Sequence, residues 1–187
     1  MRLHQSFANH QWIAIWGQWS CRHSSNSSAK MATMASPSTD NASWTRIASR
    51  LAPSRSYWLG TTNRDGSPHV APVWGVVVME SLYIYSERTT VKAANLKRDG
   101  RGVIHLESTE DVLIVHGHFD DLGIPQLLPE VIEALAEKYD WPDDAQYLPT
   151  ADPSFDVLYR LRPQKALQWS LSDYGNSQQR WTASSNL

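Results

Sequence analysis

Cysteine and long apolar runs are both scarce in this chain of 187 residues. Its one cysteine, Cys21, excludes an intramolecular disulfide and argues against cysteine catalysis, and it fits a reducing, intracellular setting. No apolar run approaches the length that a membrane span needs, and residues 12–16 are too short a run for the core of a signal peptide. We therefore expect a cytoplasmic protein without a membrane partner.

Excess charge and the common catalytic motifs are also missing. A net charge of -2 gives no electrostatic reason to expect a nucleic-acid partner. The sequence holds no P-loop, dinucleotide glycine fingerprint, Ser-His-Asp order or Cys-x-x-Cys pair, and no carboxylate pair stands out by its spacing. His116 and His118 have a spacing that can serve a metal, but no third ligand lies near them in sequence. We predict no metal site and assign no catalytic residue.

Tryptophan is abundant, with nine residues in the chain. They serve either as core and dimer packing or, in part, as the lining of a pocket for a flat ligand. Residues 1–40 lack periodicity and contain a serine-rich run, so we predict a disordered N-terminal extension. Met31 or Met34 is an alternative start, and a partner-binding segment is the competing interpretation. Residues 41–187 are expected to form a single domain.

The pattern of this domain is that of short strands with few helices. Strands are predicted at residues 57–62, 69–79, 81–86, 102–106, 112–119, 155–161 and 165–171, with a short edge segment at 178–181. A tight turn at residues 64–67 joins the first two strands, and a turn at Pro163 and Gln164 joins the last two. Helices are predicted at residues 41–51, 89–98 and 129–140. We expect a mainly β protein, a barrel with two or three flanking helices.

The end of the strand at 81–86 carries the residues that most resemble a binding site. Ser86 and Thr90 bring hydroxyls to the start of the following helix, and Lys92 lies in its first turn. A helix N-terminus offers free N–H groups and the positive end of the dipole, which suits a phosphate. A capped, solvated surface helix is the alternative.

A second feature interrupts the strand at 69–79. Pro72 cannot donate a ladder hydrogen bond, and Gly75 allows close approach to the backbone. A ligand can hydrogen-bond to main chain at such a break, although barrel curvature alone also explains it.

Together these residues resemble a known family. The order is Gly60-Thr61-Thr62, Asp65-Gly66-Ser67-Pro68-His69, Pro72-Val73-Trp74, Tyr85-Ser86 and Thr90-Val91-Lys92-Ala93-Ala94-Asn95-Leu96. It resembles the pyridoxamine 5′-phosphate oxidase-like, or FMN-binding split-barrel, superfamily. The likeness is greatest to the branch that uses the deazaflavin coenzyme F-420, which occurs mainly in actinobacteria.

The resemblance implies a Greek-key split barrel that forms a homodimer with two cofactors at the subunit interface. The cofactor-binding residues that it implies are Pro72, Val73, Trp74, Tyr85, Ser86, Thr90, Lys92, Trp169 and Arg180. Val73 and Trp74 would line the ring system, and Tyr85, Ser86, Thr90 and Lys92 would hold the phosphate. The last two residues of the list lie where the family brings C-terminal residues to the site, often from the partner subunit.

Two departures bear on the cofactor. The oxidase proper has a basic residue at the position of Trp74 and an arginine where this chain has Val91. Both argue against pyridoxamine phosphate oxidation and favour F-420 over FMN. The expected function is therefore hydride transfer from reduced F-420 to a conjugated small-molecule acceptor. An FMN-dependent oxidase or reductase, or a non-catalytic binder of flavin, deazaflavin or haem, is the alternative.

Overall fold

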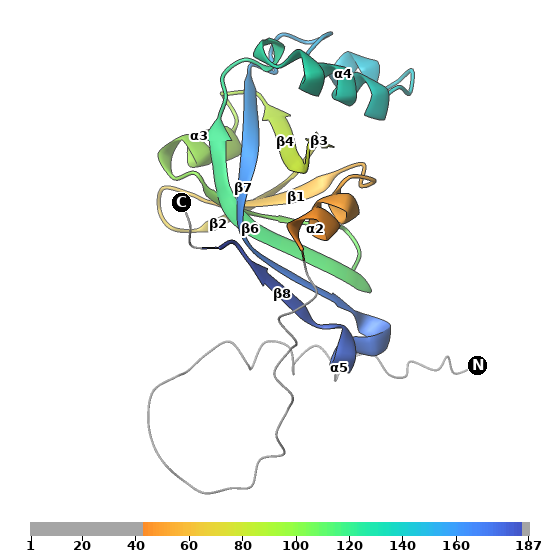
Figure 1. Cartoon of the computed structure of the whole chain (residues 1–187). Coiled ribbons are helices and arrows are strands. Elements are labelled where there is room, and N and C mark those ends of the chain that lie inside the picture. Colours follow the sequence, from red (N-terminus) through yellow and green to blue (C-terminus); the bar gives the residue numbers. More distant parts are fainter. Residues whose placement is uncertain (1–42, 185–187) are drawn as a thin grey trace, which may run out of the picture. The chain divides into compact units, whose positions relative to one another are not determined.

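The computed structural model describes residues 43–184, so the predicted extension at residues 1–40 lies outside the described part. The helices and strands of the described part are α2 (Trp44–Leu51), β1 (Tyr57–Thr62), β2 (Pro68–Val73), β3 (Gly75–Val78), β4 (Ser81–Ser86), α3 (Val91–Arg98), β5 (Arg101–His105), β6 (Asp111–Asp121), α4 (Pro129–Lys138), β7 (Val157–Ser170), α5 (Tyr174–Ser177) and β8 (Gln179–Thr182) (Figure 1). Three of these helices were predicted, and α5 is a single additional turn.

The strands form one antiparallel sheet in the order β2-β1-β5-β6-β7-β4-β3, with β8 paired to β7. β2 and β3 stand at opposite ends of this order, yet only Trp74 separates them in the chain. The chain therefore passes from one end of the sheet to the other at Trp74, and the sheet curls into the predicted mainly β split barrel. The strand predicted at residues 69–79 is interrupted at Trp74 itself, one residue before Gly75.

The prediction of two strands joined by a turn at Pro163 and Gln164 is wrong, because β7 runs through both residues. β6 pairs with β7 along its length, and the register shifts where His116 faces Lys165 but Gly117 faces Pro163. Gln164 is therefore an extra residue on β7. A β-bulge tolerates the proline, which has no N–H to give to the ladder. Two neighbours share the other edge of β7, β4 before Pro163 and β8 after it.

Apolar residues cover both faces of β4, as its alternation predicts. Leu82 and Ile84 lie in the main core inside the barrel, where α2 adds Ile47 and Leu51. Tyr85 joins a second apolar cluster that α4 completes with Val131, Leu135 and Tyr139. This second cluster sets one wall of the site described below.

The ends of α2 and α3 differ in how they are capped. The Ser43 hydroxyl accepts the N–H of Arg46 at 3.3 Å, a side-chain cap of α2. Thr90 occupies the N-cap position of α3, but its side chain makes no capping bond there. Its hydroxyl donates instead to the carbonyl of Glu87 at 2.8 Å. Within residues 43–184, the first N–H groups of α3 therefore receive no capping bond from the side chain of the N-cap residue.

Within residues 43–184, no helix combines the length and the apolar character that a membrane crossing requires. The same residues contain no group of three histidine, cysteine or acidic side chains placed to hold a metal ion. His118 instead lies 3.3 Å from a carboxylate oxygen of Asp120.

Candidate functional site

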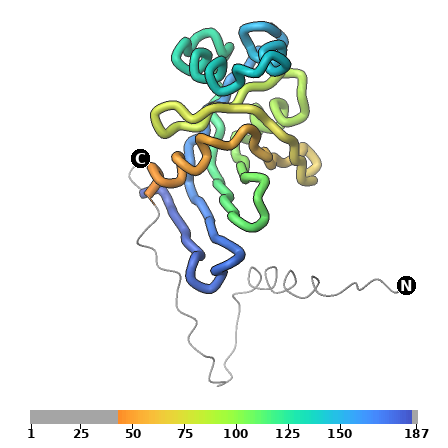
Figure 2. Tube along the Cα trace, turned by 90° about the vertical axis from the view of Figure 1, so that its right-hand side faces the viewer, coloured from red at the N-terminus to blue at the C-terminus, as the bar shows by residue number. Residues whose placement is uncertain are grey.

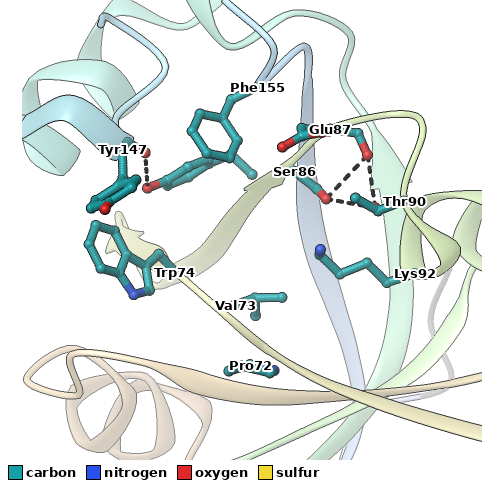
Figure 3. Close-up of a pocket in the computed structure, with 10 residues that line it drawn as sticks. Pro72, Val73, Trp74, Ser86, Glu87, Thr90, Lys92, Tyr147 and Phe155 are labelled. Atoms are coloured by element: carbon teal, nitrogen blue, oxygen red, sulfur yellow. Dashed lines mark hydrogen bonds between the residues drawn. The ribbon is translucent and has the colours of Figure 1, made fainter. Parts of the chain in front are cut away.

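A pocket of about 360 Å³ opens where the β2–β3 break, the end of β4 and the start of α3 meet. Its lining residues come from these elements and from the segment between α4 and β7: Pro72, Val73, Trp74, Tyr85, Ser86, Glu87, Thr90, Lys92, Tyr147 and Phe155 (Figure 3). All predicted site residues except Trp169 and Arg180 are among them. The fold thus brings together positions that lie up to 20 residues apart, from Pro72 to Lys92.

One end of the pocket is polar. The Ser86 and Thr90 hydroxyls lie 3.1 Å apart, and both lie within reach of the Glu87 carbonyl oxygen. Ser86 is buried, with 4% of its surface exposed. Lys92 extends from the first turn of α3 into the same end of the pocket (Figure 3). Hydroxyls, an ammonium group and the uncapped N–H groups of α3 are together a set of donors that suits an anion.

Two charged residues, Lys92 and Glu87, line this polar end. Partial burial lowers the pKa of the Lys92 ammonium, and the nearby Glu87 carboxylate offsets part of that effect. Lys92 forms no ion pair within the described residues. Its neighbour Arg88 is engaged elsewhere, since its guanidinium binds Asp121 at 2.7 and 3.1 Å. Lys92 is thus the cation available to a ligand in the pocket.

The other end of the pocket is aromatic, and two of its residues were missed by the sequence reasoning. Tyr147 lies in a 3-10 turn at Ala145–Tyr147, and Phe155 shortly precedes β7. The Tyr85 hydroxyl donates to the Tyr147 carbonyl at 2.9 Å, and the Tyr85 ring meets Phe155 edge to face at 5.1 Å. Tyr85 therefore ties this irregular segment to the sheet. The sequence offered only a loop there, so nothing indicated which of its aromatic residues turn inward.

Trp74 is held from behind by the end of α4. Its ring stacks on Tyr139 at 4.6 Å with an interplanar angle of 6°. The Tyr139 hydroxyl accepts the N–H of Gly75 at 3.0 Å and donates to the Arg55 carbonyl at 2.7 Å. Lys138 donates to the Gly75 carbonyl at 2.7 Å and to the Tyr57 hydroxyl at 3.0 Å. Lys138 and Tyr139 thus fix the chain at the β2–β3 break, and burial lowers the pKa of Lys138 to about 8.

Trp169 and Arg180 do not join the pocket of their own chain. Trp169 lies at the end of β7, where its ring meets Tyr174 edge to face at 6.3 Å. Arg180 is exposed on β8, opposite Leu167 of β7. The β7–β8 hairpin and α5 lie at the end of the domain opposite α4 (Figures 1 and 2). The expected role of these two residues, which included a contribution from the partner subunit, stays a prediction.

Comparison with known proteins agrees with this architecture. Residues 43–170 match the model of a family described as pyridoxamine 5′-phosphate oxidase. The chain belongs to this family. The family match includes every pocket residue and Trp169, whereas Arg180 lies beyond its last residue.

Solved structures share this pyridoxamine 5′-phosphate oxidase-like fold. The conserved hypothetical protein Rv2991 of Mycobacterium tuberculosis is 24% identical over 73% of this chain and 90% of its own, with a TM-score of 0.59. A heme binding protein of Mycobacterium smegmatis is 16% identical over 76% of this chain and 59% of its own, with a TM-score of 0.60. An F420 reductase is 23% identical over 63% of this chain and 93% of its own, with a TM-score of 0.51. A comparison with curated proteins finds no match.

Proposed function

We propose that this protein is an oxidoreductase that binds coenzyme F-420 in the pocket and transfers a hydride to a conjugated small-molecule acceptor. The observation that carries the proposal is the convergence of Val73, Trp74, Ser86, Thr90 and Lys92 on one pocket. A structural neighbour with the same fold is an F420 reductase, which makes this cofactor the first to test.

The residues present fit such a cofactor at both ends of the pocket. The polar end would hold a phosphate through Ser86, Thr90, Lys92 and the first N–H groups of α3. The flat aromatic system would lie along the β2–β3 break, which belongs to neither of the two adjoining ladders at Trp74. The volume of about 360 Å³ lies within the usual range for small-molecule sites.

When bound, reduced F-420 supplies the hydride, so the protein contributes mainly binding and orientation. Trp74 and its support from Tyr139 give the ring a rigid wall. Tyr147 and Phe155 add further aromatic surface to the lining of the pocket. Burial raises the pKa of the Tyr85 hydroxyl, so Tyr85 keeps its proton and holds Tyr147 in place at neutral pH.

The proposed functional unit is a homodimer. Trp169 and Arg180 lie away from the pocket of their own chain, on a hairpin that extends from the opposite end of the domain. A second copy can bring this hairpin to the pocket. Arg180 makes no ion pair within the described residues, which leaves its charge for a ligand.

The experiment that tests the cofactor is a fluorescence titration of the purified protein with F-420 and with FMN, side by side. The proposal expects tighter binding of F-420. Tighter binding of FMN would support the alternative, an FMN-dependent oxidase or reductase of the same family. The complex of the protein with reduced F-420 is then mixed with a panel of quinones and enones, and the rate of cofactor oxidation is measured. An enzyme accelerates this oxidation, whereas a non-catalytic binder does not.

A further inference from the structure

The polar end of the pocket contains few charged side chains. Of the lining residues, Glu87 and Lys92 alone are charged, and their formal charges cancel. Arg88, the next cation along the chain, is bound to Asp121, and its backbone N–H binds Asp156 at 2.7 Å. An anion that enters the pocket therefore meets one free ammonium and one carboxylate.

The free-energy penalty for removing an anion from water and its attraction to a cation in the pocket depend differently on the charge of the anion. Attraction to a fixed cation grows in proportion to the charge of the anion, whereas the penalty for leaving water grows with its square. A phosphomonoester carries about −1.5 to −2 at pH 7. A phosphodiester carries a single negative charge. A pocket with one cation therefore disfavours the monoester more than the diester.

Glu87 increases this difference. Glu87 lines the pocket, and its carboxylate lies close enough to Lys92 to offset part of the lowering of the Lys92 pKa that burial causes. Repulsion by a fixed carboxylate is about twice as strong for a dianion as for a monoanion at the same place. Glu87 is held in the turn before α3, where its carbonyl accepts from the Thr90 hydroxyl. Its carboxylate accepts from the hydroxyl of the neighbouring Thr89 at 3.5 Å.

We infer that Glu87 is a specificity-determining residue that makes this pocket favour singly charged phosphodiesters over doubly charged phosphomonoesters. The inference rests on the proposed function, because F-420 carries a phosphodiester where FMN carries a phosphomonoester. According to this inference, the charge of the Glu87 carboxylate discriminates between the phosphate groups of the two cofactors, in addition to any discrimination between their ring systems.

The test measures dissociation constants by fluorescence for four ligands: F-420, its core without the phosphate and side chain, FMN, and riboflavin. Each phosphorylated ligand thus has a partner with the same ring and no phosphate. The proteins are the wild type, Glu87→Gln and a control, Glu133→Gln, which removes the same charge from the exposed side of α4.

Glu87→Gln is expected to tighten FMN binding roughly tenfold and F-420 binding roughly threefold. The repulsion energy that is removed is twice as large for a dianion as for a monoanion, so the fold-change for FMN is about the square of the fold-change for F-420. Both uncharged ligands should bind as they do to the wild type. Glu133→Gln should change none of the four. Equal gains for FMN and riboflavin, or no gain for FMN, would overturn the role of Glu87.

The outcome also separates this inference from the proposed function. If wild-type protein binds none of the four ligands, the proposed cofactor is wrong and Glu87 has no phosphate to select. If F-420 binds and Glu87→Gln leaves the ratio of F-420 to FMN affinity unchanged, the cofactor stands and the selection by Glu87 fails. Glu87→Ala provides a second variant with the same expected direction should the glutamine variant misfold.

Discussion

Lys92 is the residue on which cofactor affinity should depend most. It is the available cation of the pocket, and a charge-assisted hydrogen bond contributes about 1.5–3 kcal/mol. Lys92→Ala is therefore expected to weaken cofactor binding by about tenfold or more, as measured by fluorescence titration. Lys97→Ala is the matched control, because Lys97 is exposed on the same helix and does not line the pocket. Equal affinity of the wild type and Lys92→Ala would refute the phosphate site.

Lys138 should leave a signature in the dependence of stability on pH. Its pKa is about 8 in the folded protein, below the ordinary lysine value of 10.5, because burial disfavours the ammonium. Between these two values the unfolded chain binds the proton and the folded protein does not, so stability rises with pH. The free energy of unfolding of the wild type should rise by up to about 1 kcal/mol from pH 7.5 to pH 9 relative to Lys138→Met.

Denaturant titrations at several pH values up to 9 would measure this difference between the two proteins. Burial raises the pKa of Tyr57 and Tyr139, which face Lys138, so both keep their protons in the folded protein over this range. Parallel pH profiles for the wild type and Lys138→Met would show that Lys138 stays charged when folded.

The bulge between β6 and β7 is the feature that matters most at the scale of elements. The bulge lets β7 continue through Pro163. One edge of β7 can therefore pair with β4 before Pro163 and with β8 after it. Gly117 opposes Pro163, and a Cβ placed there would lie 2.3 Å from the Arg162 carbonyl oxygen. The backbone of both strands would have to shift to admit it.

Gly117→Ala is therefore expected to lower the free energy of unfolding by about 2 kcal/mol or more, measured by chemical denaturation. Gly175→Ala is the control, since a Cβ at Gly175 meets nothing within 4 Å. The control should be neutral or slightly stabilising, because alanine favours helix over glycine. Similar stability of the two variants would mean that the bulge tolerates a side chain.

The assembly of two copies can be tested at the scale of the whole molecule. If the partner supplies Arg180, then both Lys92→Ala and Arg180→Ala weaken cofactor binding, although the two residues lie in different parts of one chain. Mixing the two variants under conditions that exchange subunits should restore tight sites. In a mixed dimer, one pocket combines an intact Lys92 with an intact Arg180 from the other subunit.

The fraction of tight sites in the exchanged mixture, read from a cofactor titration at low concentration, measures this complementation. Each mixed dimer should regain one tight site of its two. Absence of any tight site, in a mixture shown by mass to contain mixed dimers, would place Arg180 outside the pocket of the partner.

Short sequence patterns were sufficient to predict the helices and strands that depend on interactions between neighbouring residues. The strand at Ser81–Ser86 follows from alternation, and α4 follows from its apolar stripe and a proline at its first position. The order of residues from Val73 to Lys92 also identified the candidate site, because they come from successive elements of one short stretch. For these parts the chemistry of nearby residues is enough.

Tertiary structure decided the features that depend on distant partners. Pro163 permits a turn or a bulge, and only the pairing of β6 across from it selects the bulge. Tyr147 and Phe155 enter the pocket because Tyr85 binds the segment that carries them. Trp169 and Arg180 lie at the far end of the domain because β8 pairs with β7 beyond the bulge. Sequence sets the preference of each residue, whereas contacts between segments far apart in the chain choose among the conformations that those preferences allow.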